Sequence, residues 1–170
     1  AGEAQQLAQK ATETPEAQAE YQAGRREWNK RSKEGFENAI AHFEKAIELD
    51  PDYADPYAGM ADTYSLLPAY NFALPTDTMP KAKAYAEQAK KKNPNLAKAY
   101  TSLAWVLHQY EYDWKGAEEN YRRAAELNPN YATMNHWFGI FLSDIGKHNE
   151  AIKLTVKAKI LLEKFKNFAV

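Results

Sequence analysis

Apolar side chains recur every three or four positions along most of this chain, with polar side chains between them. That period predicts amphipathic helices, because it places the apolar residues on one face of an α-helix. The two-residue alternation typical of a half-buried strand is weak throughout. The pattern therefore predicts an all-α fold. Three of these apolar stripes are Ala39, Ile40, Phe43, Ala46, Ile47 and Leu49; Tyr53, Tyr57, Met60, Ala61 and Tyr64; and Tyr100, Leu103, Ala104 and Leu107.

Three segments around prolines share the same surroundings: AIELDPDYADPY, AKKKNPNLAKAY and AAELNPNYATMN. Small residues occur five and twelve positions before each proline and ten positions after it, and the same places can be found in a first and a fourth copy. Small side chains at helix contacts let the paired helices approach closely. The sequence therefore predicts four copies of a two-helix unit. The small residues are Gly24, Ala39, Ala46, Ala61, Ala82, Ala89, Ala104, Ala117, Ala124, Gly139, Ala151 and Ala158.

A helix–turn–helix unit of about 34 residues, with small residues at its eighth, twentieth and twenty-seventh positions and a proline near its end, resembles the tetratricopeptide repeat. The resemblance covers residues 17–162 and implies a right-handed α-solenoid. We expect repeats at about 17–53, 54–96, 97–131 and 132–170, with a leader helix within residues 1–13. The amino-acid sequences of the repeats also resemble one subgroup of the family, the repeat regions of bacterial protein kinases, adenylate cyclases and winged-helix regulators.

The copies differ in length only between their two helices. The first copy has three extra residues at 31–35, which we expect to extend its first helix or to enlarge the turn. The second has nine extra residues in the segment LPAYNFALPTDTM, and long loops of this kind often carry function. From the small residue of the first helix to that of the second, the third copy spans 13 residues and the fourth spans 12.

Both ends of the repeat region have distinctive sequences. Thr14, Pro15 and Glu16 suit the N-cap and the first two positions of a helix.

The fourth copy lacks the terminal proline, so its second helix is expected to run on towards Val170. Its apolar tail predicts self-association, a partner, or a cut within a longer array, although the tail could equally cover the last repeat. The tail residues are Leu161, Leu162, Phe165 and Phe168.

The resemblance also implies that the first helices of the repeats line a concave groove, which holds an extended peptide or a partner helix. Trp28 and Trp105 rank first, because an aromatic side chain can supply much of the binding energy in a desolvated contact. The alternative is that each tryptophan packs against a neighbouring helix, as we expect for Trp114 and Trp137. The candidates at groove positions are Tyr21, Arg25, Trp28, Asn29, Asp55, Asp62, Ser65, Leu66, Lys98, Thr101, Trp105, His108, Gln109, Thr133, His136, Ile140, Ser143 and Asp144.

One known activity of the family is the capture of a chaperone's C-terminal carboxylate by a clamp of lysines, asparagines and an arginine. In this sequence only one of the corresponding residues, Lys98, matches that clamp. A role as a chaperone co-factor is therefore disfavoured. The residues at the other corresponding positions are Tyr21, Arg25, Gly59 and Ser102.

Composition removes most other classes of function. The chain has 170 residues, no cysteine and a formal charge of −1, so a thiol nucleophile and a concentrated basic face for nucleic acid are not expected. The four histidines form no HExxH pair and the glycines form no phosphate loop, so we expect neither catalysis, a metal nor a cofactor. No apolar stretch approaches the roughly 20 residues of a membrane span. The cytoplasm is favoured as the location, with the periplasm left open.

Two functions follow from these expectations. The first is a scaffold for protein–protein interaction, which binds a peptide or helix of a partner in its groove. The alternative is a regulatory or sensory region of a larger bacterial signalling protein that acts on an output domain elsewhere. Flanking sequence would discriminate between them. The identity of the partner and its charge cannot be read from the groove positions, which carry both signs.

Overall fold

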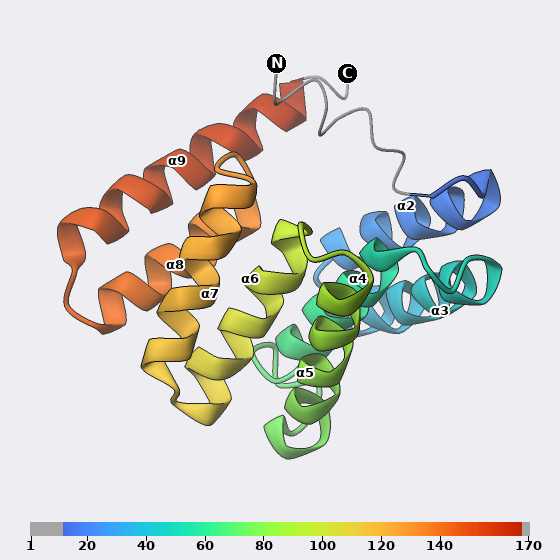
Figure 1. Ribbon diagram of the computed structural model, residues 1–170, viewed down its shortest axis with the longest axis horizontal. Helices are drawn as coiled ribbons and strands as arrows, with labels where there is room; N and C mark the ends of the chain where they lie inside the picture. The colour runs from blue at the N-terminus through green and yellow to red at the C-terminus, as the bar shows by residue number, and fades with distance from the viewer. Residues whose placement is uncertain (1–11, 168–170) are drawn as a thin grey trace. The chain divides into compact units, whose positions relative to one another are not determined.

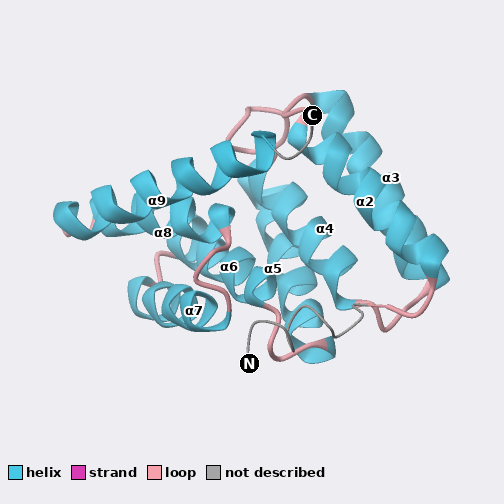
Figure 2. Ribbon diagram, turned by 90° about the horizontal axis from the view of Figure 1, so that it is seen from above, coloured by secondary structure: helices cyan, strands magenta, loops and turns pink. Residues whose placement is uncertain are grey.

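The structure, a computed structural model, describes residues 12–167 and the side chains as far as Lys164. All regular elements in this range are helical, joined by loops and turns (Figure 2). The all-α prediction is therefore confirmed. The chain divides into two units between Pro94 and Asn95. None of the helices within the described range is both long and apolar enough to cross a membrane.

The helices of the first unit pack in pairs along the chain (Figure 1). Helices α2 (Pro15–Asn29) and α3 (Lys33–Leu49) pack together, as do α4 (Ala54–Leu66) and α5 (Pro75–Lys92). Helix α4 also packs against α2 and α3. Because α4 has neighbours on three sides, every one of its side chains except Tyr64 is buried, including those of Asp55, Asp62 and Ser65.

Small residues allow this close packing, as the sequence predicted. All of the alanines and glycines that set the register of the repeats are buried. The ring of Phe43 lies between two glycines on the first helices: a Cβ atom added to Gly24 would lie 2.5 Å from this ring, and one added to Gly59 would lie 2.7 Å from it. Real Cβ atoms do not approach other atoms so closely, so both glycines are required by the ring between them.

Two of the connections between successive repeats use the same turn. After Leu49 the backbone N–H of Asp52 donates to Oδ1 of Asp50, and after Leu127 the N–H of Asn130 donates to Oδ1 of Asn128. The proline carbonyl between each pair also has a side-chain donor, Tyr57 at Pro51 and Asn135 at Pro129. Equivalent residues therefore make equivalent hydrogen bonds, which supports the alignment of the copies on these prolines.

The three extra residues of the first copy lie in its second helix. Helix α3 begins six residues before Ala39, whereas α7 and α9 begin three residues before Ala117 and Ala151, and the turn at 30–32 is no longer than the turn at 145–147. The expectation of a longer first helix or a larger turn was therefore wrong. The added turn of α3 is stable because the Ser32 side chain accepts a hydrogen bond from the N–H of Gly35 at 3.0 Å, which satisfies a free donor at the helix start.

The insertion in the second copy packs against this added turn. Part of it lengthens α5 at its start, and the rest forms the loop 67–74. The ring of Phe36, in the first turn of α3, is fully buried against the loop: its centroid lies 5.6 Å from that of Tyr70 and 6.1 Å from that of Phe72. The two departures from the common repeat length therefore stabilise each other.

The second unit also contains two helix pairs. Helix α6 (Ala97–Val106) continues into the π-helical turn η1 (Leu107–Glu111) and packs against α7 (Trp114–Leu127). Helices α8 (Ala132–Asp144) and α9 (His148–Asn167) form the second pair, and α8 also packs against α6 and α7. Gly146, in the turn of the fourth copy, has a φ of 78°, a left-handed conformation that glycine adopts without strain.

The single extra residue of the third copy is absorbed in η1. A π-helical turn holds one residue more than the α-helical turn that it replaces. The N–H of Asp113 donates to the carbonyl of Leu107 at 3.0 Å, and Tyr112 has a φ of 57°, which ends the helix. The spacing of 13 residues between Ala104 and Ala117 therefore corresponds to a π-helical bulge at the end of the first helix. His108 and Gln109 lie in this bulge.

The predictions for the chain ends have different outcomes. Thr14 and Pro15 are the N-cap and first residue of α2, as predicted. Helix α9 continues to Asn167, which confirms the predicted extension that far. The leader helix within residues 1–13 falls almost wholly outside the described residues, as do Phe168 and the side chain of Phe165.

Candidate functional site

In the first unit, residues predicted from different repeats meet between the first helices α2 and α4. Nη1 of Arg25 lies 2.9 Å from Oδ2 of Asp62, whose side chain is only 1 % exposed. A buried carboxylate is costly unless it is paired. The ion pair therefore satisfies Asp62 and at the same time holds the Arg25 side chain in one position on this surface.

Trp28 lies beneath two arginines. The guanidinium carbon of Arg25 lies 4.1 Å from the centroid of its ring, and that of Arg31 lies 3.4 Å from it. With these cations over it, the Trp28 side chain is only 1 % exposed. Cation–π attraction favours this arrangement. Trp28 is thus placed to orient two arginines rather than to present its own ring to a partner.

The other candidates of this unit divide by exposure. Asn29, at the end of α2, is exposed, and Arg25 is partly exposed. Tyr21, Asp55, Ser65 and Leu66 are buried. Sequence reasoning did not select Arg31 as a candidate. Its position over Trp28 depends on its own positive φ of 54° in the turn, and no residue pattern in the sequence predicted that conformation.

In the second unit, His108 joins the first helix of one repeat to that of the next. Its Nε2–H donates to Oδ2 of Asp144 at 2.9 Å, and the amide nitrogen of Gln109 lies 3.0 Å from its Nδ1. The rings of Trp114 and Phe141 lie 5.4 and 5.2 Å from it. His108 is buried, whereas the Asp144 side chain is 45 % exposed. The structure brings these two predicted residues together.

The surroundings of His108 favour its neutral form. Burial lowers the pKa of His108 below the ordinary value of 6.5, and the hydrogen bond and negative charge of Asp144 partly oppose that change. Burial penalises the protonated ring because it removes a charge from water. His108 therefore donates to Asp144 as a neutral imidazole near neutral pH.

The remaining candidates of the second unit are buried or line its surface. Trp105 is 8 % exposed, and its ring centroid lies 4.6 Å from that of Trp137. Trp105 therefore packs against a neighbouring helix, which was the alternative to a role in binding, and Trp137 packs in the same way, as expected. His136 and Ser143 are exposed, whereas Lys98, Gln109, Thr133 and Ile140 are intermediate and Thr101 is buried. Trp114 is partly exposed at the start of α7.

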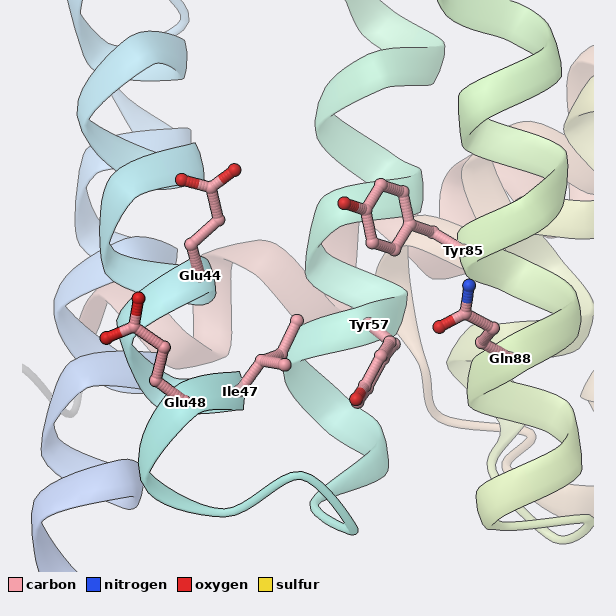
Figure 3. A pocket seen from close by; sticks show the side chains of 6 residues that line it. All are labelled: Glu44, Ile47, Glu48, Tyr57, Tyr85 and Gln88. Atoms are coloured by element: carbon pink, nitrogen blue, oxygen red, sulfur yellow. The ribbon is translucent and has the colours of Figure 1, made fainter.

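A cavity of about 420 Å³ lies on another face of the first unit, between α3 and α5 (Figure 3). Two carboxylates line one side of it and two tyrosines the other. Sequence analysis missed this site, because it considered only the groove positions on the first helices. The recurrence of tyrosine in α4 and α5 was the available signal. The lining residues are Glu44, Ile47, Glu48, Tyr57, Tyr85 and Gln88.

A further hollow lies in the second unit between α8 and α9, with a volume of about 460 Å³. Its lining is mostly apolar, with Ile140 from α8 and Ile152 and Val156 from α9. Within the described part of the chain, no three histidine, aspartate or glutamate side chains gather closely enough to hold a metal ion.

Comparison with known proteins identifies the repeat. Residues 30–67, from the α2–α3 turn to the end of α4, match the family described as TPR repeat. No curated protein matches the chain in sequence.

Solved structures of the same fold cover most of the chain. The first TPR of Spaghetti (RPAP3), bound to the HSP90 peptide SRMEEVD, has a TM-score of 0.59 and 17% identity over 79% of this chain and 97% of its own. The Sgt2 TPR domain from Aspergillus fumigatus has a TM-score of 0.61 and 22% identity over 82% and 85%.

A thermophilic TPR protein from Thermus thermophilus has a TM-score of 0.65 and 16% identity, and the match covers 85% of this chain and 74% of that one. At such identities these likenesses show the fold. Together with the match of residues 30–67 to the TPR repeat, they show that this chain has the tetratricopeptide-repeat fold.

Proposed function

We propose that this protein is a non-enzymatic scaffold for protein–protein interaction, which binds an extended peptide or a helix of a partner on the surface of its first helices. The fold supports a role in protein interaction. The RPAP3 repeat domain bound to an HSP90 peptide is an example of a similar structure in complex with a peptide. The chaperone-tail clamp is not part of the proposal, since only Lys98 matches it.

The observation that carries the proposal is the pair of arginines over Trp28. Asp62 fixes Arg25 from the neighbouring repeat, and the indole ring lies beneath both guanidinium groups. Arginines that are already held in place lose less conformational entropy when they bind a ligand. They can form paired hydrogen bonds with a carboxylate or with backbone carbonyls of a peptide. Asn29 adds an exposed amide beside them.

The proposal can be tested with purified protein and a partner captured from the source organism. An Asn29→Ala, Arg31→Ala double variant removes one side chain from the end of α2 and one from the turn that follows it, and it keeps the Arg25–Asp62 pair. We expect its dissociation constant for the partner to rise about tenfold or more, since hydrogen bonds to charged groups contribute about 1.5–3 kcal/mol each.

The matched control is a Lys33→Ala, Glu37→Ala double variant, which removes two exposed side chains from α3 that form a surface ion pair at 4.0 Å. Such pairs contribute little to stability. Circular dichroism checks that both variants are folded. If the control weakens binding as much as the first-helix variant, the partner binds elsewhere and the proposal is wrong.

A second proposal concerns self-association through α9, which the exposed stripe on this helix favours. Ile152, Val156 and Ile160 lie four residues apart on one face and are about half exposed or more. Leu162, one of the predicted tail residues, is also exposed, and Leu161 is intermediate. Contiguous apolar surface of this kind is typical of an interface.

Sedimentation velocity tests this proposal. The wild type should show a larger species as its concentration rises, and Val156→Glu should reduce it, while Lys157→Glu beside it should not. A wild-type chain that sediments as a monomer at every concentration would exclude self-association. The narrower resemblance to bacterial signalling proteins and the cytoplasmic location both stay predictions.

A further inference from the structure

The cavity between α3 and α5 in the first unit has one acidic side. Glu44 and Glu48 are four residues apart on α3 and therefore lie on the same face of the helix (Figure 3). Glu48 forms a surface ion pair with Lys45 at 3.0 Å. Glu44 forms no ion pair or hydrogen bond with the side chains described in this structure. The cavity thus has a carboxylate whose charge is not balanced by an adjacent cation.

Tyrosine rings form the opposite side. Tyr57 from α4 and Tyr85 from α5 have ring centroids 6.4 Å apart, with their planes at 46°. The hydroxyl of Tyr57 donates to the carbonyl of Pro51 at 3.0 Å, and Tyr85 stacks on Tyr64 at 5.8 Å. These contacts hold the two rings in place beside the cavity, so that little reorganisation is needed when a ligand enters.

The same group of rings already contacts cations of this chain. Nζ of Lys92 lies 5.0 Å from the centroid of Tyr57, and Nζ of Lys81 lies 5.5 Å from that of Tyr64. Tyrosine faces attract cations at about this distance. Lys92 is held by Asp52 at 3.2 Å, and neither lysine lines the cavity. Tyr57 is only 7% exposed and already has Lys92 beside it, whereas Tyr85 is partly exposed, so Tyr85 provides most of the ring surface for a further cation.

Burial and the charge of Glu44 both act on the tyrosines beside this cavity. Burial raises the pKa of Tyr85, and the charge of Glu44 raises it further. The pKa of Tyr64 is raised mainly by burial, with smaller contributions from Tyr85 and Glu44. A cation between these groups would have the opposite effect to Glu44 and would lower the pKa of Tyr85.

We propose that this cavity binds the guanidinium group of an arginine side chain from a partner protein, between the carboxylate of Glu44 and the rings of Tyr57 and Tyr85. A guanidinium group is planar, so it can stack on a tyrosine ring while its N–H groups donate to a carboxylate. The volume of about 420 Å³ is in the range of sites that hold small ligands or side chains. Gln88 adds an amide at the rim.

This site lies on a different face from the Arg25 and Trp28 surface, and it does not depend on that surface binding anything. A partner that uses both sites would gain affinity by linking two contacts on one chain. The cation site is also testable without knowing the partner, because a short arginine peptide contains the group that it recognises.

The experiment is an NMR titration of the full chain with the blocked tripeptide acetyl-Gly-Arg-Gly-amide. We expect saturable shifts that are largest around Glu44 and Tyr85, a millimolar dissociation constant, and a lower pKa of Tyr85 in protein with 13C-labelled tyrosine. The same peptide with citrulline in place of arginine has nearly the same shape and no charge, and it should bind at least about fivefold more weakly. Tetramethylammonium chloride serves as the free small cation.

Two variants locate the site. Glu44→Gln keeps the shape of an exposed side chain and removes the charge, so it should weaken arginine binding about three- to tenfold, as expected for the loss of about 1 kcal/mol of electrostatic attraction. Glu37→Gln, on the same helix and outside the cavity, should leave binding unchanged. Both replacements are at exposed positions, so neither should disturb folding.

Several results would overturn the proposal. Arginine and citrulline peptides could bind equally well, or Glu44→Gln could behave like Glu37→Gln, and either result would show that the charge is not recognised. Absence of saturable shifts up to tens of millimolar peptide would exclude the site. Tighter binding of tetramethylammonium than of the arginine peptide would assign the cavity to a free small cation instead of a partner's side chain.

Discussion

At the scale of single residues, the side chains that define the packing and the candidate surface have little room to move. Phe43 is the clearest case, since its ring is confined by Gly24 on one helix and Gly59 on another. Arg25 and Trp28 are fixed in a similar way by the charge of Asp62 and by the neighbouring guanidinium groups. The positions of these side chains are therefore determined by neighbours from more than one helix.

Replacing Gly59 with alanine should destabilise the first unit. Alanine favours helix by about 1 kcal/mol over glycine, but its Cβ would lie 2.7 Å from the Phe43 ring, which cannot retreat because Gly24 is close to the same ring. Overpacking of this kind costs about 1–3 kcal/mol. Urea unfolding should show a net loss of stability. A smaller loss in a Phe43→Leu background would confirm the cause, whereas an equal loss in both backgrounds would exclude it.

His108 should make the stability of the second unit depend on pH. Its pKa in the folded state is below the ordinary value of 6.5, so between these two values the unfolded chain binds the extra proton. The free energy of unfolding should then be largest above pH 6.5 and should fall as the pH drops towards the folded pKa. The effect of Asp144 reduces this fall but does not reverse it.

Denaturant unfolding at about pH 7.5 and about pH 5.5, on either side of the ordinary histidine pKa, measures this dependence. Tryptophan fluorescence reports mainly on the second unit, which contains Trp105, Trp114 and Trp137. We expect His108→Gln to lose less stability between the two pH values than the wild type loses. His148→Gln is the matched control, because it removes an exposed histidine and leaves His108 in place. Equal pH dependence in all three proteins would show that His108 is not the responsible group.

Residue patterns predicted which positions are buried. They predicted less well which neighbouring side chains bury them. The small residues of each repeat were found by their spacing, because close helix contacts require them, and all of them are buried. Trp28 and Trp105 occupy the predicted helices, yet their burial depends on Arg31 and on Trp137. Contacts with residues in other turns or helices are not encoded in the periodicity of one helix.

At the scale of elements, the differences between repeats carry most of the new information. Extra residues in the first and second copies lengthen α3 and α5 and form a loop that covers Phe36. The extra residue of the third copy produces the π-helical turn that carries His108. The lengths of these insertions were visible in the sequence. Their locations were not, because either helix or the turn can accept added residues at similar cost.

Replacing Phe36 with alanine tests the packing between the two insertions. A fully buried phenylalanine costs about 3–5 kcal/mol when it is truncated to alanine, and Phe36 has no exposed surface. Tyr70→Ala should cost less, since Tyr70 is 40% exposed. Thermal unfolding of both variants gives the order. If Phe36→Ala is as stable as the wild type, the contact between loop 67–74 and α3 does not support the first unit.

At the scale of the whole molecule, the chain consists of two units with the same plan. In each, a first helix of one repeat contacts that of the next through a charged or polar pair, Arg25 with Asp62 and His108 with Asp144. Sequence reasoning predicted the repeated helix pairs, because a repeated spacing specifies a repeated fold, but it predicted neither the division after Pro94 nor these two side-chain pairs. It could not identify the cavity between α3 and α5, which is formed by residues of three helices.

In the proposed function, a partner binds on the surface of the first helices. Site-specific photo-crosslinking tests it most directly, with benzoylphenylalanine introduced in turn at Asn29, His136, Glu37 and Glu119, all of which are exposed. The first two lie on first helices and the other two on second helices. We expect the partner to be crosslinked from Asn29 in the first unit or from His136 in the second, and not from Glu37 or Glu119. Crosslinks that form mainly from Glu37 and Glu119 would contradict it.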